Sequence, residues 1–169
     1  HKPDRRQRQM CIRDRVNNLE IESFSFSKSK NKILIFTQSV KVWRYNTRGD
    51  YWVYDFKKNE IQKLGRNMSS SSLMFAKFSP NERFVAYVSK EKTESGIRNS
   101  STSVNIYLEN LDDRTIKKLT SSNETKKLIN GTFDWVYEEE FGCRDGFIFN
   151  EDGTRTVSYT HLTLPTIRL

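Results

Sequence analysis

Residues 73–88, LMFAKFSPNERFVAYV, contain two short apolar runs on either side of a polar turn. The runs at 73–78 and 84–88 are rich in aromatic and β-branched side chains, which favour strands. The residues between them, SPNE at 79–82, are typical of a turn. This stretch therefore predicts two β-strands joined by a tight connection.

The same pattern occurs 52 residues earlier in the chain. The dipeptide Phe-Ser at 26–27, followed by the apolar run 33–36, aligns with Phe-Ser at 78–79, followed by the run 85–88. A third copy begins at Phe149. Sequence periods near 50 residues with about four strands each are typical of β-propeller blades.

Further strand-like runs complete this repeat. They lie at 21–26, 32–37, 51–56, 104–108 and 115–120, with turn residues at 46–50, 57–59 and 112–113. The predicted fold class is all-β: a partial β-propeller of about two to three blades of antiparallel four-stranded sheets, with an inserted acidic loop or short helix. Repeat units bury their faces only against neighbouring repeats, so we expect the chain to be a fragment of a propeller.

The net charge has a local origin. The chain has 169 residues with 29 Lys+Arg and 21 Asp+Glu, a formal net charge of +8. Residues 1–15 hold six Lys+Arg and two acids, residues 156–169 hold one Arg and no acid, and the remainder holds 22 Lys+Arg and 19 acids. A nucleic-acid-binding domain would carry a basic face on its folded part. The charge distribution therefore disfavours nucleic acid as a partner.

The two ends of the chain also differ from its middle in composition. The strings RRQRQMCIRDR (5–15) and VSYTHLTLPTIRL (157–169) resemble peptides translated from sequencing-adapter DNA. Segments of foreign origin are excluded from fold reasoning. We therefore expect residues 1–15 to be an artefact with no fold, residues 156–169 to be a second artefact, and residues 16–155 to form the propeller domain.

Within residues 16–155 the chemistry of several enzyme classes is unavailable. Both histidines, His1 and His161, lie outside this range, and Cys143 is its only cysteine. Neither a Ser-His-Asp triad nor a Cys/His zinc site can be assembled there. Arg144 stands where the nucleophile of a Gly-x-Ser-x-Gly elbow would lie. We expect no catalytic residue, no metal ligand and no cofactor in this chain.

The segment 129–140, INGTFDWVYEEE, lacks strand alternation and ends in three consecutive carboxylates. One interpretation is a solvated acidic turn or the amino end of a helix, and composition alone favours it because runs of charge usually face water. The other is a docking site for a cation, since two carboxylates can accept charge-assisted hydrogen bonds from a protonated amine. We expect Trp135 and Tyr137 in this segment to pack rather than to line a cavity.

The string DWVYEEE at 134–140, preceded by Asn130 and Gly131, resembles the double-glutamate motif of the dipeptidyl peptidase IV family. Other parts of the chain resemble the propeller blades of that family in the same order, namely KVWR at 41–44, the run 51–56 and FSP at 78–80. The resemblance covers about residues 16–155, and its most specific part is the DWVYEEE string.

This resemblance implies a binding site for a peptide amino terminus. In the family, two propeller glutamates hold the free amino group of the substrate, and the motif position gives this role to Glu139 and Glu140 rather than to Glu138. The family also uses a propeller arginine near the substrate carbonyl. The spacing of Arg66 does not match that residue clearly, so we assign no arginine to the role.

The resemblance also implies the setting of the complete protein. Its expected partners are peptides with a free amino terminus and an α/β-hydrolase domain of the same chain that bears Ser, Asp and His, and it allows for a homodimer. The whole would be an exported serine dipeptidyl peptidase, periplasmic, extracellular or membrane-anchored. The alternative is a non-catalytic β-propeller that acts as a protein-interaction scaffold. A Gly-x-Ser-x-Gly domain in the same gene would favour the enzyme.

Overall fold

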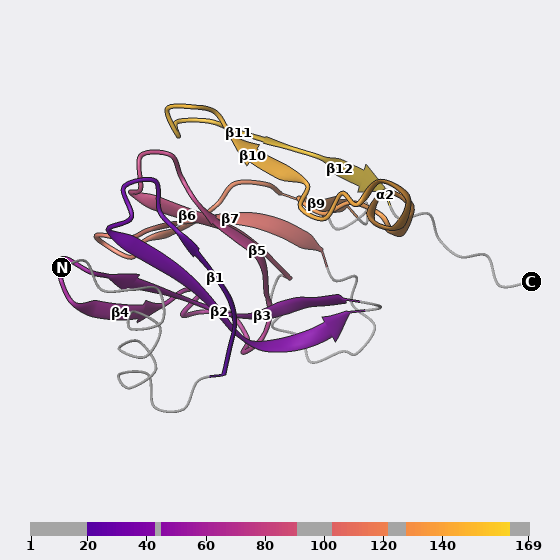
Figure 1. Cartoon of the computed structure of the whole chain (residues 1–169). Helices are drawn as coiled ribbons and strands as arrows, with labels where there is room; N and C mark the ends of the chain where they lie inside the picture. The colour runs from indigo at the N-terminus through magenta and orange to yellow at the C-terminus, as the bar shows by residue number, and fades with distance from the viewer. Residues whose placement is uncertain (1–19, 43–44, 91–102, 122–127, 163–169) are drawn as a thin grey trace, which may run out of the picture.

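The computed structural model describes residues 20–42, 45–90, 103–121 and 128–162 (Figure 1). The described chain begins with an antiparallel meander in which each strand pairs with the next. Its strands are β1 (Ile21–Phe26), β2 (Lys32–Val42), β3 (Tyr45–Asp55) and β4 (Glu60–Lys63).

A second meander follows in the same order. Its strands are β5 (Leu73–Phe78), β6 (Phe84–Lys90), β7 (Val104–Asn110) and β8 (Ile116–Lys118), again paired in sequence. One residue pair, Gly49 with Leu73, joins β3 to β5. Among the described residues, strand pairing therefore connects the two sheets at this one point.

The last part of the described chain forms a smaller unit, drawn in orange and yellow in Figure 1. It consists of β9 (Leu128–Asn130), α2 (Trp135–Phe141), β10 (Phe147–Phe149), β11 (Thr156–Ser158) and β12 (Thr160–Leu162). β9 adds to β7 in parallel and pairs with β12, whereas β10 forms a hairpin with β11. The helix α2 is the only one in the part of the chain that the structure describes.

The hydrogen-bond register confirms the predicted repeat. Phe26 pairs with Ile33, Phe78 with Val85, and Phe149 with Thr156. The three phenylalanines therefore occupy equivalent positions in three successive hairpins. The first two units agree beyond this point as well, since Tyr54 pairs with Ile61 and Glu109 with Ile116.

The three hairpins also share one turn geometry. The N–H groups of Ser27, Ser79 and Asn150 each donate to the carbonyl oxygen five residues further on, at 3.0, 2.9 and 3.0 Å. Each turn contains a residue with positive φ, namely Lys30 (61°), Glu82 (57°) and Gly153 (73°). A side chain makes this conformation costly. Because a lysine and a glutamate adopt it, we infer that the pairing of the flanking strands imposes the turn.

One predicted turn, residues 46–50, is wrong. These residues lie within β3, which continues to pair with β2 beyond a bulge near Val40. Gly49 permits this pairing, because a Cβ at that position would lie 2.3 Å from the ring of Phe36 and 2.6 Å from the carbonyl oxygen of Thr37. In a sequence, a glycine such as Gly49 suggests a turn. Here its lack of a side chain allows β3 to approach β2 closely.

Each meander buries its apolar residues against the next one. The cluster between the first two contains Leu34, Val53, Leu64, Leu73, Val85, Tyr87, Tyr107 and Leu111. Alternate residues of β6 divide between two interfaces: Val85 and Tyr87 belong to this cluster, whereas Ala86 and Val88 form another with Phe147 of the third unit. Because successive side chains of a strand point to opposite faces, β6 is buried on both sides.

A buried carboxyl also links the two meanders. Glu109 on β7 is 1% exposed, and its Oε2 accepts hydrogen bonds from the N–H of Gly65 at 2.9 Å and the hydroxyl of Tyr87 at 3.1 Å. Gly65 lies in the connection between β4 and β5. Burial raises the pKa of Glu109 above its ordinary value, although both hydrogen bonds act in the opposite direction. The carboxyl thus holds the connection against the second sheet.

We expect Glu109→Gln to flatten the pH dependence of stability. The pKa of Glu109 is higher in the folded protein than in the unfolded chain, so its contribution to stability is present at low pH and is lost as the pH rises through the folded pKa. Glutamine keeps the size and an acceptor oxygen but does not titrate. Between about pH 4 and pH 7, Tm should therefore fall less for the variant than for the wild type.

Thermal unfolding followed by circular dichroism at several pH values measures this difference. Glu60→Gln makes the same charge change at an exposed position and is the control, which should keep the wild-type dependence. Equal slopes of Tm against pH for wild type and Glu109→Gln would contradict the expectation.

Candidate functional site

The acidic segment contains the short helix α2. Of the two structures predicted for it, a loop or a short helix, the helix is the one observed. Asp134 caps its amino end, since Oδ1 accepts hydrogen bonds from the N–H groups of Val136 at 2.9 Å and Tyr137 at 3.1 Å. Gly142 ends the helix in the left-handed conformation, φ 66°, and its N–H donates to the carbonyl oxygen of Tyr137. Both caps come from local sequence, so the two ends of the helix are set locally.

Close backbone contacts hold this helix against the rest of the protein. Gly146 donates its N–H to the carbonyl oxygen of Gly131 at 3.0 Å, and a Cβ on Gly146 would lie 2.9 Å from the backbone of Gly131 and of Thr132. A Cβ on Gly131 would lie 2.6 Å from Ile106. The two ends of the loop that carries α2 therefore meet where only glycine fits.

A buried polar network fixes the start of the same loop. Asn130 is 3% exposed, and its Nδ2 donates to the carbonyl oxygen of Val104 and to Oδ1 of Asn105, both at 3.2 Å. Its Oδ1 accepts a hydrogen bond from the hydroxyl of Thr160 at 2.8 Å. The amide is thus bonded on both sides, and it sets the position from which the chain leaves β9 toward α2.

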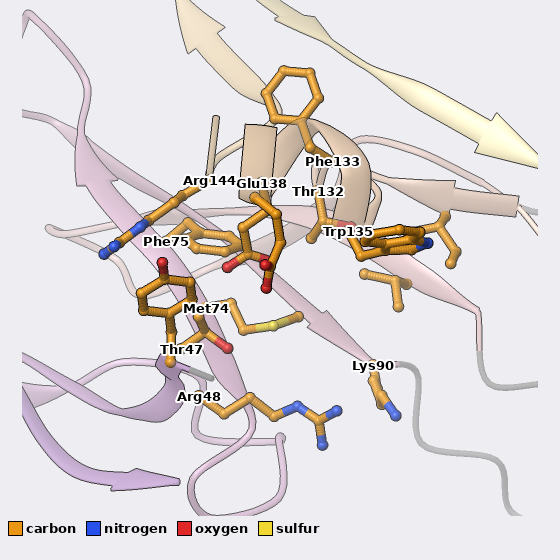
Figure 2. A pocket seen from close by; sticks show the side chains of 14 residues that line it. Thr47, Arg48, Met74, Phe75, Lys90, Thr132, Phe133, Trp135, Glu138 and Arg144 are labelled. Carbon is orange, nitrogen blue, oxygen red and sulfur yellow. The ribbon is translucent and has the colours of Figure 1, made fainter. Parts of the chain in front are cut away.

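A pocket of about 720 Å³ lies between β3, the second meander and α2 (Figure 2). Its apolar wall consists of Tyr45, Met74, Phe75, Val104, Ile129, Phe133 and Trp135. Its charged lining consists of Glu138, Glu139, Arg48, Lys90 and Arg144, and Thr47 and Thr132 complete it. A concave, mostly apolar surface with a few charged groups is the usual composition of a binding site.

The structure brings one of the two predicted glutamates into this pocket. Glu139 lines it, whereas Glu140 is exposed on the same helix and is not part of the lining. Glu138, to which the motif gave no role, lines the pocket and is half-buried. Figure 2 shows the Glu138 carboxylate extending from α2 into the pocket. Three consecutive helical residues cannot all face one side, which is why the pocket takes only part of the acidic run.

The prediction that the aromatic residues pack is correct for one of them only. The Tyr137 ring lies 5.7 Å from that of Phe133 and 5.9 Å from that of Tyr159, in an aromatic cluster beside the helix. Trp135 is 71% exposed and lines the pocket. Trp43, which we expect to pack in a blade core, lies outside the described residues.

The apolar wall includes one strained residue. Phe75 has φ 55°, in the bulge of β5 where the register with β6 shifts between Met74 and Lys77. A positive φ is uncommon for a bulky residue and tends to occur at binding and catalytic sites. Tyr51 packs beneath this bulge: burial raises its pKa to about 12, opposed by hydrogen bonds from the backbone of Ala76 and Phe75. Its hydroxyl is therefore protonated at neutral pH.

The basic lining was not predicted from sequence. Arg48 lies on β3, Lys90 ends β6, and Arg144 follows α2, so 96 residues separate the first from the last. The Arg144 guanidinium lies 4.2 Å from the ring centre of Tyr45. Arg66 is not part of the lining. No sequence pattern links these residues, because only the packing of the three units brings them together.

Among the described residues, no three His, Cys, Asp or Glu side chains come close enough to hold a metal ion. None of the described residues belongs to a helix with the length and apolarity to cross a membrane.

Three successive hairpins of one register, packed face to face, define part of a β-propeller. The sequence profile of the family described as the dipeptidyl peptidase IV (DPP IV) N-terminal region matches residues 27–162. The chain therefore belongs to the dipeptidyl peptidase IV family, as a fragment of its amino-terminal propeller. Residues 156–162 form β11 and β12, and their foreign origin stays a prediction.

Named relatives agree with this assignment. Dipeptidyl aminopeptidase B of Saccharomyces cerevisiae is 34% identical over 124 residues, which cover 73% of this chain and 13% of that protein. The probable dipeptidyl-aminopeptidase B of Talaromyces stipitatus is 29% identical over 128 residues, or 75% of this chain and 13% of that protein. The chain thus spans only a small part of the length of the curated relatives it matches.

A solved structure supports the fold. The crystal structure of Porphyromonas gingivalis dipeptidyl peptidase 4 superposes with a TM-score of 0.56 at 24% sequence identity, covering 85% of this chain and 22% of that one. At this identity the comparison concerns the fold alone.

We expect Gly131→Ala to destabilise the protein more than Gly142→Ala does. Both glycines have positive φ, 76° and 66°, so both variants carry the backbone cost of about 1 kcal/mol. Only at Gly131 would the new methyl group also meet Ile106 and Val88, whereas nothing lies within 4 Å at Gly142. Overpacking adds about 1–3 kcal/mol, so chemical denaturation should separate the variants by that amount. Equal losses would show that Gly131 is not crowded.

Proposed function

We propose that the protein recognises the free amino terminus of a peptide, through Glu139 and Glu140, as the substrate-binding region of a serine dipeptidyl peptidase. The observation that carries the proposal is the acidic helix α2 at the wall of a pocket, in a chain of the dipeptidyl peptidase IV family. The named relatives are dipeptidyl aminopeptidases, whose name describes release of dipeptides from an amino terminus.

The physical basis is charge complementarity. A peptide α-amine and a carboxylate are both charged at neutral pH, and the ammonium has three N–H donors. Glu139 lines the pocket and Glu140 follows it on the exposed side of the helix. An ammonium group that approaches across the open side of the pocket can donate hydrogen bonds to both carboxylates. Trp135 and Phe133 next to them offer an apolar surface for the first residue of the peptide.

Residues 16–155 contain no histidine for a Ser-His-Asp triad, so in this proposal the reaction takes place elsewhere in the complete protein. We propose that an α/β-hydrolase domain of the same chain supplies Ser, Asp and His, and that the complete protein is exported. The competing proposal is a propeller that only binds other proteins. Sequencing of the complete gene distinguishes the two, because a Gly-x-Ser-x-Gly motif in a hydrolase domain is needed for the first and absent in the second.

We expect Glu139→Gln and Glu140→Gln in the complete protein each to lower kcat/KM by roughly 10- to 150-fold on dipeptide substrates with a free amine. Each change removes one charged acceptor and keeps the shape, and a hydrogen bond to a charged group contributes about 1.5–3 kcal/mol. By the motif, Glu138→Gln should have the smaller effect.

Amino-terminally acetylated substrates provide the control, because they present no cation. On these substrates the wild type should lose its advantage over the Glu139 and Glu140 variants. Unchanged kcat/KM for both variants on free-amine substrates would sink the proposal and leave α2 as a solvated acidic helix. If Glu138→Gln has the largest effect, the amine is bound by Glu138 and Glu139, the two glutamates that line the pocket.

A further inference from the structure

The pocket beside α2 has a second charged side, made of cations. The Arg48 side chain comes from the first meander and the Lys90 side chain from the second. Figure 2 shows the Arg48 guanidinium and the Lys90 amine on the side of the pocket away from the helix that carries Glu138. The site therefore holds groups of opposite sign on different walls.

These two cations lack the partners that a structural role would provide. The Nε atom of Arg48 is buried and makes no hydrogen bond. Ion pairs between two described residues involve Lys58, Lys63 and Lys77, and not Arg48 or Lys90. Buried polar atoms in folded proteins are normally bonded, so an unbonded one in a pocket wall is a candidate contact for a ligand.

The two cations also act on each other unfavourably. The pKa of Lys90 is lowered, first by burial and then by the positive charge of Arg48. Like charges that face the same pocket without a counter-ion repel each other, and a bound anion removes this cost. The other cation in the lining, Arg144, already packs on the ring of Tyr45.

We propose that Arg48 and Lys90 bind the side-chain carboxylate of an acidic first residue, in a peptide whose amino terminus is held by the glutamates of α2. This inference rests on the proposed function and adds a substrate preference to it. The pocket has an acidic wall on α2 and a basic wall formed by Arg48 and Lys90. An amino-terminal Glu or Asp matches both walls, because it carries an ammonium and a carboxylate on one residue. Guanidinium and ammonium groups are the usual partners of such a carboxylate.

The test compares three substrates of the complete protein, Glu-Ala-, Met-Ala- and Lys-Ala-4-nitroanilide. Their first residues are unbranched and of similar length but differ in charge. We expect kcat/KM for Glu to exceed that for Met by about 10-fold or more, with Lys lowest, since each carboxylate contact is a charge-assisted hydrogen bond. A ratio of Glu to Met near 1 in the wild type would overturn the proposal.

Variants assign the preference to the two residues. Arg48→Gln and Lys90→Gln should each reduce the Glu-to-Met ratio several-fold, whereas Arg48→Lys and Lys90→Arg should restore part of it. Lys57→Gln makes the same charge change on an exposed turn outside the pocket and should keep the wild-type ratio. A ratio that falls equally in Lys57→Gln would attribute the preference to net charge and contradict the proposal.

Two further results distinguish a failure of this inference from a failure of the proposed amino-terminus site. Suppose that Glu139→Gln and Glu140→Gln leave kcat/KM on free-amine substrates unchanged while Arg48→Gln still lowers the Glu-to-Met ratio. In that case the amino-terminus proposal is wrong and the assignment of Arg48 and Lys90 is retained. Inhibition by Ala-Ala and by its carboxamide tests another source of carboxylate, the end of the dipeptide product. If Arg48→Gln abolishes only the difference between these inhibitors, the assignment to the first side chain is wrong.

Discussion

A sheet of this protein can bury both of its faces only if another sheet lies on each side. β6 meets this condition, because Tyr87 faces the first meander and Val88 the third unit. The β10–β11 hairpin does not, and the side chains of Ile148 and Val157 on it are 66% and 70% exposed. Apolar side chains of this size each contribute roughly 1.5–3 kcal/mol when buried, so the fold depends on contacts between successive blades.

The pocket is a consequence of that stacking. Its walls come from the start of β3, from β5 and β6, and from the loop that carries α2, so no single blade contains it. Glycines let these parts approach: Gly49 where β3 pairs with β2, and Gly131 with Gly146 at the base of the loop. Small changes at these glycines should therefore affect a site to which they contribute no functional group.

The electrostatic character of the site has two origins. The acidic groups come from one local element, a short helix that Asp134 and Gly142 cap. The basic groups come from three separate segments and meet only in the folded chain. A ligand with both charges on one residue fits this arrangement better than a simple cation, because each wall then has a counter-charge.

The sequence by itself determined the class of the fold and the motif of the site. The 52-residue repeat predicts the positions of Phe26 and Phe78, because strand pairing in a hairpin is set over short distances, and DWVYEEE identifies the acidic segment.

The tertiary structure decided which side chains share the pocket. It places Glu138 and Glu139 in the lining and Glu140 outside it, since the orientation of α2 depends on contacts of Gly131 and Asn130 with β6 and β7. It also places Arg48 and Lys90 in one pocket, although they lie in different blades and share no local pattern that a sequence could reveal.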